Sequence, residues 1–221
     1  MLSRKLLLSL GLATTLSMPA YASGFSLNIV GNITPQHTAT LISSEDKRDQ
    51  KALDFIKDLA KQGIGFLEDQ SMTEEKRKEE FRNVLKNNFD MKTIGRFALG
   101  RYWKTSTSAE KDEYLKLFEE MVVDVYSRRF SDYNGEGFSV LSARAQGTSD
   151  SIVSSQIIPA SGSKISVEWR VREKNGTLKI IDIMVEGVSM SLTQRSDFAS
   201  VIQRGGGNID ILLDHLRPQS E

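Results

Sequence analysis

The sequence predicts an α+β fold: a mostly antiparallel four-stranded sheet with helices packed around it, enclosing an apolar cavity. Apolar residues recur at helical spacing from about residue 46 to residue 133. After Asn134-Gly135 the spacing changes to alternation, and helical spacing returns near residue 194. The strands thus form one block between two blocks of helices, an order that favours a single sheet covered by helices. Helices of unequal length against such a sheet leave a hollow interior.

The N-terminal segment has the pattern of a secretory signal peptide. Arg4 and Lys5 precede the uncharged, leucine-rich run Leu6–Leu16, and Ala20-Tyr21-Ala22 is a cleavage site of the A-x-A kind. A membrane anchor is the alternative, but the run has about half of the roughly 20 residues that a bilayer-spanning helix needs. We therefore expect residues 1–22 to be removed and the mature protein to reside in the periplasm.

The remaining chain is expected to form a loosely ordered lead-in, residues 23–48, and a single domain, residues 49–221. The whole chain has 29 Lys and Arg against 29 Asp and Glu, and loss of the signal segment leaves a net charge near −2. Such a balance gives no global basic field, so nucleic acid is not an expected partner. Cysteine is absent, which excludes disulfides, a thiol nucleophile and thiolate metal sites.

The first block contains four predicted helices, three of them before residue 100. An apolar stripe predicts one over residues 46–68. Ser71-Met72-Thr73-Glu74 has the form of a capping box and predicts a second helix, ending at Asn88. Asp90 can cap a short third helix that ends at about Leu99.

A second capping box, Thr107-Ser108-Ala109-Glu110, predicts the longest helix, ending at about Tyr133. Its apolar stripe is wider than one packed seam requires. The strands are predicted over residues 138–144, 151–158, 164–172 and 177–190, with a type I′ turn at Asn175-Gly176 and a bulge or bend near Gly187. Two helices, over residues 194–203 and 208–216, complete the chain.

Residues that could perform catalysis are not grouped. His37 and His215 have no neighbour whose spacing makes it a catalytic partner. Asp182 and Glu186 are four residues apart on one predicted strand, about 13 Å, which is too far for both to act on one bond. We therefore expect no enzyme activity, and no cofactor or metal site.

Several motifs, in order over about residues 50–217, resemble those of the MlaC family, also called the toluene-tolerance Ttg2D proteins. The run from Asn88 to Trp103, Asn-Phe-Asp-Met-Lys-Thr-Ile-Gly-Arg-Phe-Ala-Leu-Gly-Arg-Tyr-Trp, is similar to the family's signature. Further similarity lies at Tyr126, Val167–Val171, Ile181–Met190 and Gln194–Phe198. Residues 23–48 match no pattern of the family.

This resemblance implies a periplasmic carrier of an ABC transport system that binds phospholipid, acyl chains inside, and helps to maintain outer-membrane lipid asymmetry. Its implied partners are an inner-membrane ABC transporter complex with its substrate-binding ring and an outer-membrane lipoprotein complex. Two alternatives stay open: a carrier of hopanoid-type lipid, and a periplasmic adaptor that binds a protein partner and holds no lipid.

Within these motifs, the apolar members are assigned to the lipid-binding cavity wall: Phe97, Tyr102, Trp103, Val122, Tyr126, Trp169, Ile183, Val185 and Met190. Arg96, Arg101 and Arg195 are expected at the mouth, where they would meet the phosphate of the headgroup. Alternatively, these arginines pair with Asp90, Asp182 or Glu186 and fix the junction between helices and sheet.

Overall fold

The computed structural model describes residues 44–217. The predicted signal segment and residues 23–43 of the predicted lead-in lie outside the described residues. The first helix begins at Ser44, so the last part of the predicted lead-in is helical. The helices before the sheet are α1 (Ser44–Glu68), α2 (Glu74–Asn88), α3 (Met91–Leu99), α4 (Tyr102–Thr105) and α5 (Ser108–Ser127).

Two of the three predicted N-terminal helix caps are confirmed in detail. Asp90 caps α3 by accepting the Thr93 N–H at 2.9 Å. Thr107 and Glu110 form the reciprocal bonds of a capping box at the start of α5.

The helix α2 starts later than the predicted capping box. Its N-cap is Thr73, whose hydroxyl oxygen accepts the Lys76 N–H at 3.3 Å. Ser71 is engaged elsewhere, because its N–H and hydroxyl both donate to the Asp69 carboxylate, at 2.9 and 2.6 Å. That local turn delays the helix by two residues.

The prediction that the helix after Thr107 is the longest and reaches Tyr133 is wrong. α5 has 20 residues and ends at Ser127, whereas α1 has 25. A 3-10 turn, η1 (Phe130–Asp132), follows α5. The Phe130 ring lies 5.7 Å from that of Phe66 and 5.2 Å from that of Phe81. This packing requires the chain to leave the α5 axis, and it overrides the helical apolar spacing.

The sheet is antiparallel and has the order β1-β2-β3-β4-β5. The four predicted strands are present, and a fifth of two residues is added. The type I′ turn is confirmed, since Asn175 and Gly176 have φ values of 53° and 76°. The strands are β1 (Gly137–Gln146), β2 (Asp150–Ile158), β3 (Ile165–Lys174), β4 (Thr177–Val185) and β5 (Val188–Ser189).

The predicted long last strand, reaching Met190, is wrong. β4 ends at Val185, and a tight turn at Glu186 and Gly187, with φ values of 50° and 78°, leads into β5. Met190 is instead the first residue of α6 (Met190–Arg204). The predicted bend near Gly187 is thus confirmed. A separate irregularity lies earlier in β4, where the pairing with β3 shifts register and leaves Ile181 as an extra residue.

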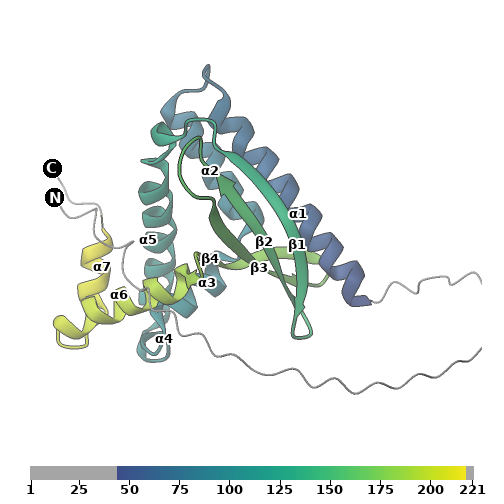
Figure 1. Ribbon diagram of the computed structural model, residues 1–221. Helices are drawn as coiled ribbons and strands as arrows, with labels where there is room; N and C mark the ends of the chain where they lie inside the picture. The colour runs from purple at the N-terminus through teal and green to yellow at the C-terminus, as the bar shows by residue number, and fades with distance from the viewer. Residues whose placement is uncertain (1–43, 218–221) are drawn as a thin grey trace, which may run out of the picture. The chain divides into compact units, whose positions relative to one another are not determined.

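Two groups of buried residues flank the interior. One joins α1 to the sheet and includes Ile56, Val153 and Ile180. The other joins α3, α5, α6 and α7 (Asp210–Leu216), and includes Tyr114 and Phe198. In Figure 1, β1 and β2 cross α1, while α5 stands to the left of the strands. The space between α5 and the sheet is therefore flanked by both groups.

A buried carboxylate holds the sheet together near the β1–β2 turn. Asp150, only 2 % exposed, accepts hydrogen bonds from Arg172 at 2.7 and 2.8 Å and from Arg170 at 2.8 Å. Burial alone would raise the pKa of Asp150, but the hydrogen bonds from the two guanidinium groups outweigh it, and the pKa lies below its usual value. Asp150 thus stays ionised and ties β2 to β3.

Candidate functional site

The main cavity of the described chain has a volume of about 720 Å³. Its lining residues come from α1, α2, α3, α5 and η1, from β1, β2, β3 and β4 of the sheet, and from the start of α6. Its walls are mostly aliphatic and aromatic. The apolar lining residues include Ile56, Leu59, Ile64, Phe66, Leu67, Phe81, Val84, Leu85, Phe89, Met91, Ile94, Phe118, Met121, Val122, Val125, Tyr126, Phe130, Phe138, Ile157, Ile165, Trp169, Ile183 and Met190.

Aromatic rings give two walls of the cavity a fixed shape. Phe130 packs edge-to-face against Phe66 and Phe81, which joins η1 to α1 and α2. On the sheet, Phe138 of β1 contacts Trp169 of β3 with ring centroids 6.3 Å apart. Such edge-to-face pairs hold rings in a preferred geometry. The cavity is therefore bounded by interlocked rings as well as by flexible aliphatic side chains.

Polar lining residues come mainly from the segment that follows α5: Arg129, Asp132, Tyr133 and Glu136. Tyr133 donates its hydroxyl to Glu68 at 3.3 Å. Arg129 is exposed, and among the described residues it is the one Lys or Arg that lines the cavity. No carboxylate of the described chain forms an ion pair with it. A free guanidinium at the edge of an apolar cavity is suited to an anionic group on a bound molecule.

The lining also includes Asp182, whose carboxylate is fully occupied. It accepts hydrogen bonds from the Ile183 N–H, the Ser189 hydroxyl, and both the N–H and hydroxyl of Ser191. Asp182 thereby fixes the first turn of α6, where an anion also favours the helix dipole. Asp182 therefore stabilises the N-terminus of α6.

Five of the nine predicted wall residues line the cavity: Val122, Tyr126, Trp169, Ile183 and Met190. Val185 does not, although it is two residues from Ile183, because β4 ends there and the chain turns at Glu186.

Phe97, Tyr102 and Trp103 also lie outside the cavity lining. Phe97 is 42 % exposed on α3, whereas Tyr102 and Trp103 are half-buried against the core between α3 and α5. The signature motif is continuous in sequence, but α3 and α4 present its members to different surroundings.

None of the three predicted headgroup arginines lines the cavity, and the alternative pairing is not what the structure has either. Arg96 lies over the Trp103 ring at 6.0 Å, Arg101 over Tyr102 at 4.9 Å and Arg195 over Phe97 at 5.2 Å. The carboxylates expected as partners bond elsewhere: Asp90 to Thr93, Asp182 to Ser191, and Glu186 to the Ser166 N–H.

Several cavity residues were not assigned to the site from sequence. The α1 stripe of Ile56, Leu59, Ile64 and Leu67 was predicted as a buried helix face, and it forms a wall of the cavity. Its helical spacing could have found it. No sequence pattern marked Arg129 as a site residue, because a continuous helix was predicted through this position.

Residues 44–217 hold no group of three or more His, Cys, Asp or Glu side chains placed to bind a metal ion. Within the same residues, no helix combines the length and the apolar character that crossing a membrane requires.

The sequence pattern of the family described as MlaC protein matches residues 57–218, most of the chain and all elements from α2 to α7. The chain belongs to the MlaC family. It is 24 % identical over 140 residues to the intermembrane phospholipid transport system binding protein MlaC of Haemophilus influenzae, covering 62 % of this chain and 64 % of that one.

A second relative is the toluene tolerance protein ttg2D of Pseudomonas putida, 22 % identical over 114 residues, with 52 % and 53 % of the two chains covered. The matches thus span less than two thirds of either relative. This MlaC-family fold is also that of a phospholipid-binding protein from Ralstonia solanacearum, solved in complex with a phospholipid. The TM-score is 0.65 at 19 % identity, over 75 % of this chain and 94 % of that one.

Proposed function

We propose that this MlaC-family protein is a periplasmic lipid carrier, which binds a phospholipid with its acyl chains in the 720 Å³ cavity. The observation that carries the proposal is the lining, which is mostly apolar and includes few charged side chains. Sheltering acyl chains from water is worth about 0.8 kcal/mol per methylene, which an enclosed apolar cavity can supply. The named properties of the two relatives and of the Ralstonia protein support the same assignment.

The lipid contacts in this proposal come from both sides of the cavity. Val122 and Tyr126 on α5 face Trp169 and Ile183 on the sheet, and Met190 closes the end near α6. We assign Arg129 to the phosphate, because it is the unpaired cation of the lining. This replaces the assignment of the phosphate to Arg96, Arg101 and Arg195.

The carrier would exchange lipid with two partners, an inner-membrane ABC transporter complex with its substrate-binding ring and an outer-membrane lipoprotein complex. A bilayer shelters acyl chains as well as the cavity does. The net direction of transport must therefore come from the partners or from ATP use. No catalytic step is part of this proposal.

Mass spectrometry of the purified protein, after extraction with organic solvent, tests the proposal. We expect lipid with two or more acyl chains, at up to one molecule per protein. If the extract contains a hopanoid, the carrier function stands, and the lipid carried is a hopanoid instead of a phospholipid. The proposal fails if no lipid is extracted and the protein takes none up from phospholipid vesicles. The remaining hypothesis is then an adaptor that binds a protein partner and holds no lipid.

A further inference from the structure

A second feature of the molecule is a group of cations with no carboxylate partner. Between Asp90 and Glu110 the chain carries Lys92, Arg96, Arg101 and Lys104, and no acidic residue. None of the four forms an ion pair within the described chain. The flanking acids are engaged as caps, Asp90 with Thr93 and Glu110 with Thr107. The positive charge of α3 and α4 is therefore not neutralised locally.

Aromatic rings are interleaved with these cations. Arg96 and Lys111 both lie over the Trp103 ring, at 6.0 and 5.6 Å. Arg101 lies over the neighbouring Tyr102 ring and also donates to its hydroxyl at 2.9 Å. Cation–π contacts of this kind hold the charged groups in place while their outer edges stay free to bind.

Arg195 of α6 adds a further cation beside those of α3 and α4. Its guanidinium lies over the Phe97 ring, and its side chain packs on Gly100, where an added Cβ would come within 2.9 Å of Nε. The bare Gly100 backbone thus lets α6 bring a further cation beside α3. We call the surface formed by these cations and rings on α3, α4, α6 and the start of α5 the cation–aromatic patch.

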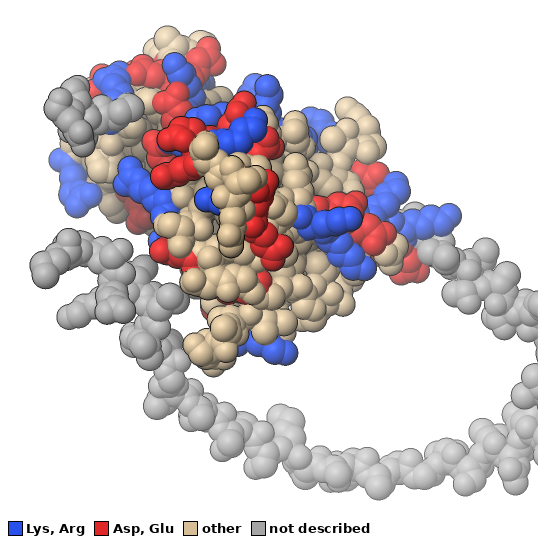
Figure 2. Space-filling view, turned by 90° about the horizontal axis from the view of Figure 1, so that it is seen from above, with Lys and Arg blue, Asp and Glu red and all other residues tan. Residues whose placement is uncertain are grey.

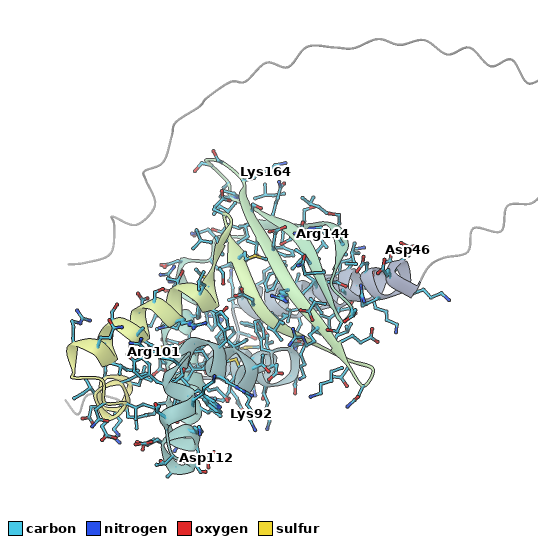
Figure 3. All side chains as sticks on the ribbon, turned by 90° about the horizontal axis from the view of Figure 1, so that it is seen from below. Asp46, Lys92, Arg101, Asp112, Arg144 and Lys164 are labelled. Carbon is cyan, nitrogen blue, oxygen red and sulfur yellow. The ribbon has the colours of Figure 1, made fainter. Side chains whose placement is uncertain are left out.

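The same helices contribute to the cavity. Met91 and Ile94 of α3 line it, as do Met190 and Gln194 of α6, whereas Lys92, Arg96 and Arg195 do not. Figure 3 shows Lys92 and Arg101 on the underside of the molecule, where α3 and α4 lie. The face in Figure 2, seen from above, has basic and acidic side chains interspersed. On α3 and α4 all the charged side chains are basic, whereas the adjoining parts of α5 and α6 also carry the exposed acids Asp112 and Asp197.

We infer that the cation–aromatic patch docks the protein reversibly onto an anionic lipid bilayer surface. Lys, Arg, Trp and Tyr together are typical of groups at a membrane interface, and each cation near an anionic surface adds to the attraction. Arginine and aromatic residues are common to membrane-binding and protein-binding surfaces, but protein–protein interfaces are depleted in lysine, so the three lysines of the patch favour the bilayer. Because the net charge of the whole chain is +0, the attraction is local to this patch. The electrostatic attraction to the bilayer does not depend on what the cavity holds.

Co-sedimentation with vesicles tests the inference. We expect the purified protein to sediment with vesicles of equal parts phosphatidylcholine and phosphatidylglycerol, but not with phosphatidylcholine alone. Binding should weaken as salt rises from 0.01 M to 0.15 M, since the Debye length falls from about 30 Å to about 8 Å. Protein that stays in the supernatant with both vesicles at low salt, yet binds polyglutamate, would overturn the bilayer assignment in favour of an acidic protein.

Matched variants locate the surface. Arg96→Gln, Arg101→Gln and Arg195→Gln should each weaken binding to the anionic vesicles, by about fivefold, as expected for one cation near the surface. Lys61→Gln removes the same charge from an exposed position on α1 and should leave binding unchanged. Equal losses in all four variants would show that only net charge matters and would refute the patch. Circular dichroism confirms folding, and unchanged cargo in the extracts separates this result from a failure of the carrier proposal.

Discussion

Trp169 donates its indole N–H to the hydroxyl of Ser155 at 2.9 Å, and Ser155 donates in turn to the Val167 carbonyl at 2.9 Å. Ser155 is buried in β2, so the polar atom of Trp169 is satisfied inside the sheet. The ring is then free to face the cavity as an apolar surface. This bond lets a tryptophan line an apolar cavity without presenting an unpaired donor to it.

Ser155→Ala should lower the free energy of unfolding by about 1–3 kcal/mol, the usual cost of leaving a buried donor unsatisfied. Urea denaturation measures it. Ser154→Ala is the matched control, because the half-buried Ser154 makes only a long bond to Glu168, at 3.4 Å, and should change stability by at most about 0.5 kcal/mol. Equal midpoints for the two variants would contradict the role assigned to Ser155.

Asp150→Asn should destabilise the protein by roughly 1–3 kcal/mol near neutral pH, because Arg170 and Arg172 lose their charged acceptor. The pKa of Asp150 is lowered in the folded protein, so its contribution is complete above the unfolded value of about 3.9 and is lost as the pH falls through the folded value. Urea melts of both proteins should therefore differ by a constant amount above about pH 5 and converge below pH 4. A gap that widens on acidification would show that another group is responsible.

Much of the fold could be predicted because its signals are local. A cap such as Asp90, a capping box such as Thr107 with Glu110, and an Asn-Gly turn each satisfy backbone groups within a few residues. Gly187 predicted a bend in the last strand, but not that the strand ends there, because Glu186 also adopts a left-handed conformation and turns the chain back. The end of α5 depends on Phe130 packing against distant residues.

The site was predicted only in part. Wall residues such as Tyr126 and Trp169 were assigned because they belong to motifs that resemble those of the family, and both line the cavity. Residues next to each other in a motif need not share a surface, and Phe97 is three residues from Ile94, yet only Ile94 lines the cavity. Arg129 could not be assigned, since its position depends on where α5 ends.

Arg129→Gln should reduce phospholipid retention a few-fold, in keeping with roughly 0.2–1 kcal/mol for an ion pair at an exposed site. Phospholipid per protein, measured after a timed exposure to acceptor vesicles, gives the loss. Arg128→Gln is the control, because Arg128 is also exposed but does not line the cavity. If both variants retain as much lipid as the original protein, the phosphate does not meet Arg129.

Ile180 and Ile183 on β4 separate a core position from a cavity position. Ile180 is 0 % exposed and belongs to the core between α1 and the sheet, whereas Ile183 is half-buried and lines the cavity. An unpaired carboxylate in a core costs several kcal/mol, so Ile180→Asp should unfold a domain stable by about 5–15 kcal/mol or lower its melting temperature sharply. In Ile183→Asp the charge can hydrate in the empty cavity, so the protein should stay folded and lose its lipid. Circular dichroism melts with lipid extraction decide the matter: a folded Ile183→Asp protein with a full lipid complement would mean that β4 does not line the lipid site.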